Sequence, residues 1–235
     1  MIYLFDVDGT LTPSRGVMDP DFKQFFRNLP NYSLVTGSDK PKTIEQVGED
    51  VFAGAEYSFN CSGNDVYKQG KHLYKSDWQP SKYLINFLEQ CLETSTYTER
   101  YGNHIEVRTG MVNFSVVGRN AVDDQRTKYF KWDQTIGERR RIASVLKMQF
   151  PELAAEVGGE TGIDIYPEGL DKSQVIQYFP DADIHFFGDR CEAGGNDHSL
   201  ALKLDRVSHV KNWKETWNIL ERALKYTNPQ MAVTQ

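Results

Sequence analysis

The chain has 235 residues, of which 39% are apolar and 26% charged, enough for one large domain or for a core with a smaller insert. A formal net charge of −6 argues against nucleic acid or an anionic membrane as a partner, because both are bound through dense basic surface. No apolar stretch approaches the length of a membrane span, and the three cysteines are odd in number and far apart, so we expect a reduced, cytoplasmic protein without disulfides.

Short apolar runs predict the strands of a parallel sheet. The first run, at 2–5, begins almost at the amino terminus and leaves no secretory signal before it; others follow at 32–35 and 184–187. Continuous runs are typical of strands buried on both faces of such a sheet, and each run here ends at small or acidic residues. Ligands of α/β sheets bind beyond the carboxyl ends of the strands, so we expect these three ends to form one site.

The middle of the chain has a different periodicity. Apolar and polar residues alternate at 105–108 and 112–117, which predicts antiparallel strands buried on one face. One helix is expected from Ser81, and another after an N-cap at Thr135. A last helix is expected after Asn212, with a polar tail beyond Tyr226.

These patterns predict two domains. We expect an α/β core with a parallel sheet, formed by residues 1–77 and 167–235. Between its strands we expect an inserted α+β cap, an antiparallel sheet with helices, at residues 78–166.

The most informative stretch is DVDGTLT at 6–12, directly after the first strand. Side chains two apart on a strand share a face, so Asp6 and Asp8 can leave the strand end together, and Gly9 permits a tight turn. A carboxylate can attack phosphorus to form an aspartyl phosphate, and a second carboxyl can hold a proton for the oxygen that leaves or attacks. Nucleophile and phosphate are both anionic, so a hard cation is needed, and ligands without His or Cys favour Mg²⁺. For the D-x-D pair alone, a solvated acidic turn is the alternative.

The full string resembles motif one of the haloacid dehalogenase superfamily of phosphotransferases. Thr36 and Ser38 follow the second strand and offer hydroxyls and backbone N–H groups at a helix start, which suits a phosphate oxygen. The resemblance makes Lys172 the lysine that neutralises the nucleophile and the phosphoryl group. It implies that three carboxylates hold Mg²⁺: Asp6, Asp8 and Asp189. In the fourth motif of the superfamily, Asn196 and Asp197 support that site.

The segment between these motifs resembles the cap of eukaryotic-type phosphomannomutases. The resemblance is carried by residues 105–113, 118–120, 158–160 and 164–169. In that family, the core attacks one phosphate of the sugar while the cap grips the other end. Carried over residue by residue, the substrate-binding positions are Arg15, Arg108, Arg119, Arg126, Gly162 and Asp164. Guanidinium groups bind phosphate through paired hydrogen bonds, which supports the arginines. By contrast, Arg139-Arg140-Arg141 are expected on the exposed face of a helix.

The resemblance implies interconversion of mannose 6-phosphate and mannose 1-phosphate, which supplies GDP-mannose synthesis. Hexose 1,6-bisphosphate would be the activator that phosphorylates Asp6, Asp8 would move protons to and from the sugar, and the cap would form a homodimer. Two departures leave a sugar phosphatase open as an alternative: Gly162 replaces a serine that contacts ligand, and Thr36 replaces a glycine. A non-catalytic sugar-phosphate-binding protein is a third alternative, which the intact acidic residues and Lys172 disfavour.

Overall fold

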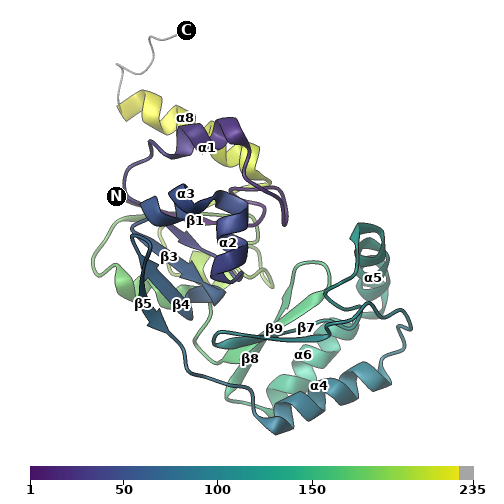
Figure 1. The fold of residues 1–235 in the computed structure, drawn as a ribbon. Helices are drawn as coiled ribbons and strands as arrows, with labels where there is room; N and C mark the ends of the chain where they lie inside the picture. Colours follow the sequence, from purple (N-terminus) through teal and green to yellow (C-terminus); the bar gives the residue numbers. More distant parts are fainter. Residues whose placement is uncertain (228–235) are drawn as a thin grey trace.

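The computed structural model describes residues 1–227, which form two sheets, each with its own helices (Figure 1). The larger sheet has the strand order β11-β10-β1-β2-β3-β4-β5. Its strands are β1 Ile2–Asp6, β2 Tyr32–Val35, β3 Tyr57–Asn60, β4 Asp65–Lys68, β5 Lys71–Lys75, β10 Ile184–Gly188 and β11 Arg206–His209. The five strands from β11 to β3 are parallel, while β4 and β5 add an antiparallel edge. The three strands predicted from apolar runs are confirmed.

Helices complete the core. They are α1 Pro20–Phe26, α2 Lys40–Val47, α3 Glu49–Gly54, α7 His198–Ala201 and α8 Trp213–Thr227, with the 3-10 helices η1 Cys61–Gly63 and η2 Lys172–Tyr178. The predicted cap at Asn212 is confirmed, because its side chain accepts hydrogen bonds from the N–H groups of Lys214 and Glu215 at 3.0 and 3.3 Å. Phe22 stacks on Trp213 and Trp217, so α1 and α8 lie side by side (Figure 1).

The smaller sheet forms the predicted cap. Its strand order is β6-β7-β9-β8, all antiparallel. The elements are α4 Lys82–Thr94, β6 Ile105–Arg108, β7 Met111–Phe114, α5 Asp123–Ile136, α6 Glu138–Gln149, β8 Leu153–Gly158 and β9 Gly162–Pro167. In Figure 1, α4 and α6 lie on the face of this sheet that is turned away from the core. Alternate strand residues pack there, including Val112, Phe114, Ile163 and Ile165, which leaves the opposite, polar face toward the core. The domain boundaries at 78 and 166 stay a prediction.

The predicted helix start at Thr135 is wrong. Thr135 lies inside α5, where its hydroxyl donates to the carbonyl of Lys131 at 3.3 Å. The next helix, α6, begins after Gly137, whose φ of +71° ends one helix and allows another to start. The cap at Ser81 is confirmed, since its hydroxyl accepts the N–H of Leu84 at 3.2 Å.

Arg139 was predicted to be solvated, and this is also wrong. Its side chain is 2% exposed and donates to Asp133 at 2.7 Å. One terminal nitrogen, Nη1, reaches the carbonyls of Gly158, Gly159 and Gly162 at 3.3, 3.1 and 3.4 Å. Arg139 therefore holds the turn between β8 and β9, while Arg140 and Arg141 are exposed as predicted.

Of the helices in the described part, none is long and apolar enough to cross a membrane. Cys61, Cys91 and Cys191 are free. The polar tail predicted after Tyr226 lies, from residue 228 on, outside the described residues.

Candidate active site

Acidic residues meet where β1 and β10 end. Asp6 is the last residue of β1, and Asp189 follows the last residue of the neighbouring strand β10. Carboxylate oxygens of Asp6, Asp189 and Asp197 lie within 4.8 Å of one another. Gly9 makes this approach sterically feasible: its φ is +86°, and a Cβ there would collide with the Asp189 carboxylate. The glycine of the D-x-D-G string therefore makes room for another carboxylate.

Lys172 lies beneath this acidic cluster, with 1% of its surface exposed. Its Nζ donates to Asp6 Oδ1 at 2.5 Å and to Asp197 Oδ1 at 2.7 Å. Burial lowers the pKa of the lysine, but Asp197 and then Asp6 raise it by more, so the net shift is upward. Lys172 is therefore a charged counter-ion of the carboxylate that the sequence predicts to be the nucleophile.

The charge balance of the cluster suits a divalent cation. Burial raises the pKa of Asp6 well above its usual range; Lys172 opposes the rise, and Asp197 and Asp189 add to it. Burial and the neighbouring Asp197 raise the pKa of Asp189 to about 6. Asp6 Oδ2 is buried and accepts no hydrogen bond from any described residue. An unpartnered carboxylate oxygen beside further carboxylates is the kind of donor set that Mg²⁺ binds.

The oxygens of Asp197 are already engaged, which distinguishes it from the other two carboxylates. Oδ1 accepts from Lys172, and Oδ2 accepts the N–H of Arg190 at 3.1 Å. Asp197 thus orders the loop after β10, in keeping with a supporting role, and Asp6 and Asp189 have the oxygens that fit a cation.

Asp8 occupies a different environment from the acidic cluster. Its Oδ1 accepts a hydrogen bond from Gln46 Nε2 at 3.0 Å and another from the backbone N–H of Arg15. Arg15 has a φ of +57°, an unusual conformation for a residue with a side chain. The Asp8 side chain is not part of the side-chain cluster that could hold a metal ion, so its role as a ligand stays a prediction.

The loop after β2 supplies polar groups beside the acidic cluster. The N–H of Ser38 donates to the Thr36 hydroxyl at 3.1 Å, which curls the loop into a tight turn. Asp39 then caps α2 by accepting the N–H of Lys42 at 3.0 Å. Both predicted residues of this turn, Thr36 and Ser38, line the cleft described below.

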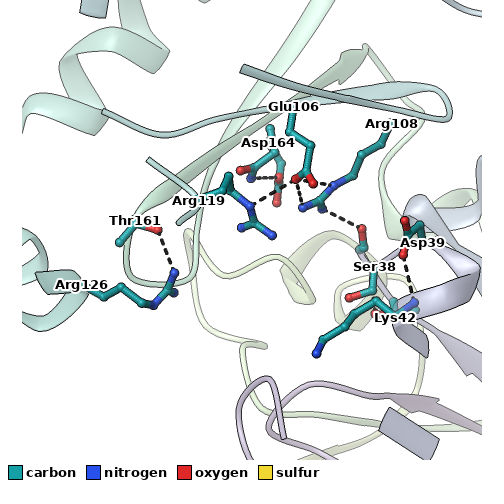
Figure 2. A network of polar contacts seen from close by, with 12 residues as sticks. Ser38, Asp39, Lys42, Glu106, Arg108, Arg119, Arg126, Thr161 and Asp164 are labelled. Atoms are coloured by element: carbon teal, nitrogen blue, oxygen red, sulfur yellow. Dashed lines mark hydrogen bonds and ion pairs between the residues drawn. The ribbon is translucent and has the colours of Figure 1, made fainter. Parts of the chain in front are cut away.

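Figure 2 shows arginines of the cap converging above this loop. Arg108, at the end of β6, donates from Nη1 to the carbonyl of Gly37 at 3.2 Å and so joins cap to core. Arg119 follows β7 and forms an ion pair with Glu106, with 3.2 Å between Nε and Oε2. Arg126 extends from α5 to the Thr161 hydroxyl at 3.4 Å.

Asp164 is fixed by a neighbouring strand. Its Oδ1 accepts a hydrogen bond from Asn113 Nδ2 at 2.6 Å. The absence of a side chain at Gly162 makes room for this contact, because a Cβ there would lie 2.7 Å from the same Nδ2. The glycine that departs from the family pattern is therefore coupled to the position of Asn113.

The predicted residues line one cleft of about 410 Å³ between core and cap. From the core it is lined by Asp6, Asp8, Arg15, Thr36, Ser38 and Asp189. From the cap it is lined by Arg108, Arg119, Arg126, Gly162 and Asp164. Lys172 lies below this lining, in contact with Asp6.

Sequence reasoning missed three polar residues of the site. Glu106 and Asn113 lie on the polar side of strands whose alternation was recognised, and β-sheet register places Asn113 between Glu106 and Asp164. That alternation was the signal that could have found them. Gln46 gave no signal, because a glutamine on a helix is usually solvated, whereas this one is 1% exposed.

An α/β core with an inserted cap is the fold of known proteins of the haloacid dehalogenase type. A similar structure is the IMP-nucleotidase of Plasmodium falciparum, with a TM-score of 0.66 and 14% identity over 95% of this chain and 68% of that chain. Another is a haloacid dehalogenase-like hydrolase from Bacteroides thetaiotaomicron, with a TM-score of 0.60 and 12% identity over 94% and 98%. These likenesses concern the fold alone, and they show that the chain has a haloacid dehalogenase-like fold.

Sequence comparison gives the family. A model described as eukaryotic phosphomannomutase matches residues 20–226. A phosphomannomutase of Dendrobium officinale is 35% identical over 222 residues, 89% of this chain and 88% of the relative. That of Saccharomyces cerevisiae is 34% identical over 234 residues, 93% and 92% of the two chains. The chain belongs to the eukaryotic phosphomannomutase family.

Proposed function

We propose that this protein is a Mg²⁺-dependent phosphomannomutase, which interconverts mannose 6-phosphate and mannose 1-phosphate through a phosphorylated Asp6. The observation that carries the proposal is a single cleft with two ends suited to anions. At the core end, a buried carboxylate lies beside a lysine and two further carboxylates, a group that could hold a cation. At the cap end, three arginines face the same space. Such a cleft suits a sugar that carries phosphate at one end and accepts or donates phosphate at the other.

The first half of the reaction loads the enzyme. An oxygen of Asp6 attacks a phosphorus of hexose 1,6-bisphosphate, so that an O–P bond to Asp6 forms and the bond to the sugar oxygen breaks. Asp8 gives a proton to the departing sugar oxygen. Lys172 holds the nucleophile in place and offsets the charge that accumulates beside it.

The second half returns the phosphate to a sugar. Asp8 removes the proton from the free hydroxyl of a bound mannose phosphate, and that oxygen attacks the phosphorus of the aspartyl phosphate, so that the O–P bond to the sugar forms and the bond to Asp6 breaks. The bisphosphate that results must turn end for end, so the same arginines accept a phosphate on carbon 1 or on carbon 6. Asp6 and Asp189, with Asp8 as the family resemblance implies, would hold Mg²⁺, whose positive charge would offset the repulsion between nucleophile and phosphate.

The cap favours transfer of the phosphate from Asp6 to the sugar over transfer to water. An aspartyl phosphate is open to hydrolysis unless the site is dry. Arg108, which bridges cap and core through the carbonyl of Gly37, contributes to a closed arrangement around the sugar. We infer that the homodimer expected of the family forms through the cap, and that the enzyme acts in the cytoplasm on small sugar phosphates for GDP-mannose synthesis.

A sugar phosphatase is the second candidate function. Gly162 favours this function, since it lacks a side chain that could contact the sugar. With one contact fewer to hold the sugar, water competes better for the phosphate on Asp6. Mannose 1-phosphate with a catalytic amount of glucose 1,6-bisphosphate separates the two activities. Accumulation of mannose 6-phosphate is the result expected of a mutase. Stoichiometric release of inorganic phosphate would contradict it and support the phosphatase.

A further inference from the structure

Glu106, which no part of the proposed reaction uses, lies between Arg108 and Arg119 (Figure 2). A single oxygen, Oε2, accepts a hydrogen bond from Arg108 Nε at 2.9 Å and forms an ion pair with Arg119 Nε at 3.2 Å. A second nitrogen of Arg108, Nη2, contacts the same oxygen. One carboxylate therefore orients two guanidinium groups.

The two arginines differ in which nitrogens remain open to a ligand. All three nitrogens of Arg108 have protein partners, since Nη1 donates to the carbonyl of Gly37. Arg119 uses only Nε, and its two terminal nitrogens have no acceptor among the described residues. Both side chains line the cleft. The arginine with an open fork toward the substrate is thus Arg119, held in place through Glu106.

Electrostatics explains why a carboxylate is needed at this point. Burial lowers the pKa of Arg119, and the nearby Arg108 lowers it further, while Glu106 opposes the change. Burial also lowers the pKa of Arg108, but Asp164 and then Glu106 raise it by more. Without Glu106, two half-buried cations would face each other before any phosphate arrives, and they would separate toward solvent.

The position of Glu106 on a paired strand fixes the direction of its side chain. Glu106 lies within β6, paired with Asn113 of β7, and Asn113 in turn pairs with Asp164 of β9. Its side chain is 31% exposed, so a large part of it is fixed by neighbours. A residue on a strand keeps its direction better than one on a loop.

We propose that Glu106 is a positioning residue for the sugar-bound phosphate: it holds Arg108 against the core loop and turns the free fork of Arg119 into the cleft. The proposal rests on the proposed mutase function. Glu106 does not bind the phosphate itself, because two anions would repel each other and its Oε2 is already shared by the arginines.

The test compares Glu106→Gln, which keeps the shape and removes the charge, with Glu152→Gln. Glu152 is an exposed carboxylate of the cap outside the cleft, so the control removes the same charge from the same domain. Charge-assisted hydrogen bonds are strong enough that we expect Glu106→Gln to raise KM for mannose 1-phosphate by about tenfold or more. We expect kcat to change by less than about threefold, because the reacting groups lie in the core. Hydrolysis of a small aryl phosphate, which leaves the cap end empty, should be unchanged.

A double-mutant cycle tests whether Glu106 acts through Arg119. In the Arg119→Ala background, Glu106→Gln should add no more than about a threefold rise in KM, because the fork that Glu106 turns into the cleft is gone and only its effect through Arg108 remains. Full additivity would overturn the proposal, as would a wild-type KM in Glu106→Gln or tighter binding in that variant. If aryl phosphate hydrolysis fell together with mutase activity, Glu106 would be supporting the fold instead, and the proposal would also fail. An inactive wild-type protein would count against the proposed function before any variant is compared.

Discussion

Lys172 is buried between Asp6 and Asp197 and donates hydrogen bonds to both carboxylates. Lys172→Met would leave two buried acidic groups without their counter-ion. We expect a loss of about 3–5 kcal/mol in the free energy of unfolding, because an unpaired buried charge is costly, together with loss of turnover. Urea unfolding of the two proteins measures the difference.

Lys203→Met is the matched control for that variant. Lys203 donates to a neutral partner, the Ser173 hydroxyl, at 2.8 Å. Losing such a bond should cost about 1 kcal/mol or less. Equal losses in the two variants would contradict the account of Lys172 as a buried counter-ion.

Substitution of Gly162 tests how tightly the cap side of the cleft is packed. An alanine Cβ would lie 2.7 Å from Asn113 Nδ2, so Gly162→Ala should displace the amide that holds Asp164. We expect KM for mannose 1-phosphate to rise severalfold, with a loss of about 1 kcal/mol in stability. Steady-state kinetics in the wild-type and Asn113→Ala backgrounds measure the effect. Since the displaced amide is absent in the second background, an equally large effect there would exclude this mechanism.

At the residue scale, the sequence predicted groups that belong to local motifs and missed those defined by distant contacts. Asp6, Asp8 and Gly9 could be interpreted together, because strand geometry and turn chemistry relate neighbours in the chain. The burial of Arg139 could not be predicted, since the three carbonyls that it binds lie 19 to 23 residues away along the chain. A basic run on a helix gives no sign of such partners.

At the scale of elements, the cap sheet presents one polar row across its four strands. Glu106 of β6 pairs with Asn113 of β7, which pairs with Asp164 of β9, which pairs with Glu156 of β8. Paired residues on neighbouring strands lie on the same face of a sheet. The row therefore brings three carboxyl groups and one amide to the face that meets the substrate cleft.

Glu156, a member of this row, should make the stability of the folded protein depend on pH. Burial raises the pKa of Glu156 to about 7, and the nearby carboxylates of Asp171 and Asp164 add to the rise. Because the folded state holds this proton more tightly, the stabilisation is present below the ordinary pKa of 4.5 and is lost as pH rises through about 7.

We therefore expect the melting temperature of the wild type to fall, relative to that of Glu156→Gln, as pH is raised from about 5 to 8. Thermal unfolding of both proteins at several pH values checks this. Glu152→Gln, which alters an exposed carboxyl group, should show no such trend. A difference between wild type and Glu156→Gln that did not change with pH would rule out titration of Glu156 in this range.

Periodicity predicted elements better than it predicted their ends. The apolar runs located β1, β2 and β10, because strands buried on both faces leave a continuous apolar signal. The start of α6 was misplaced, because Thr135 and Glu138 match a capping pattern while Gly137 ends the preceding helix two residues later. Local signals compete at such a junction, and tertiary packing decides between them.

At the scale of the whole molecule, function depends on two domains meeting across the cleft. The contact of Lys172 with Asp6 joins residues 166 apart in sequence, and that of Arg108 with Gly37 joins residues 71 apart. No periodicity in the sequence predicts such contacts; the resemblance to a family placed Lys172 beside the nucleophile, whereas the contact of Arg108 with Gly37 was not predicted. What the family pattern did not supply were Glu106 and Asn113, which orient the side chains that it names.

The most direct test is to trap phosphate on Asp6. Protein incubated with labelled hexose 1,6-bisphosphate and Mg²⁺, then quenched in acid, should carry an acid-stable, hydroxylamine-sensitive label that peptide mapping locates at Asp6. Asp6→Asn should remain folded and carry no label. A wild-type protein that converts mannose 1-phosphate while never becoming labelled, or an Asp6→Asn variant with normal turnover, would contradict the covalent mechanism.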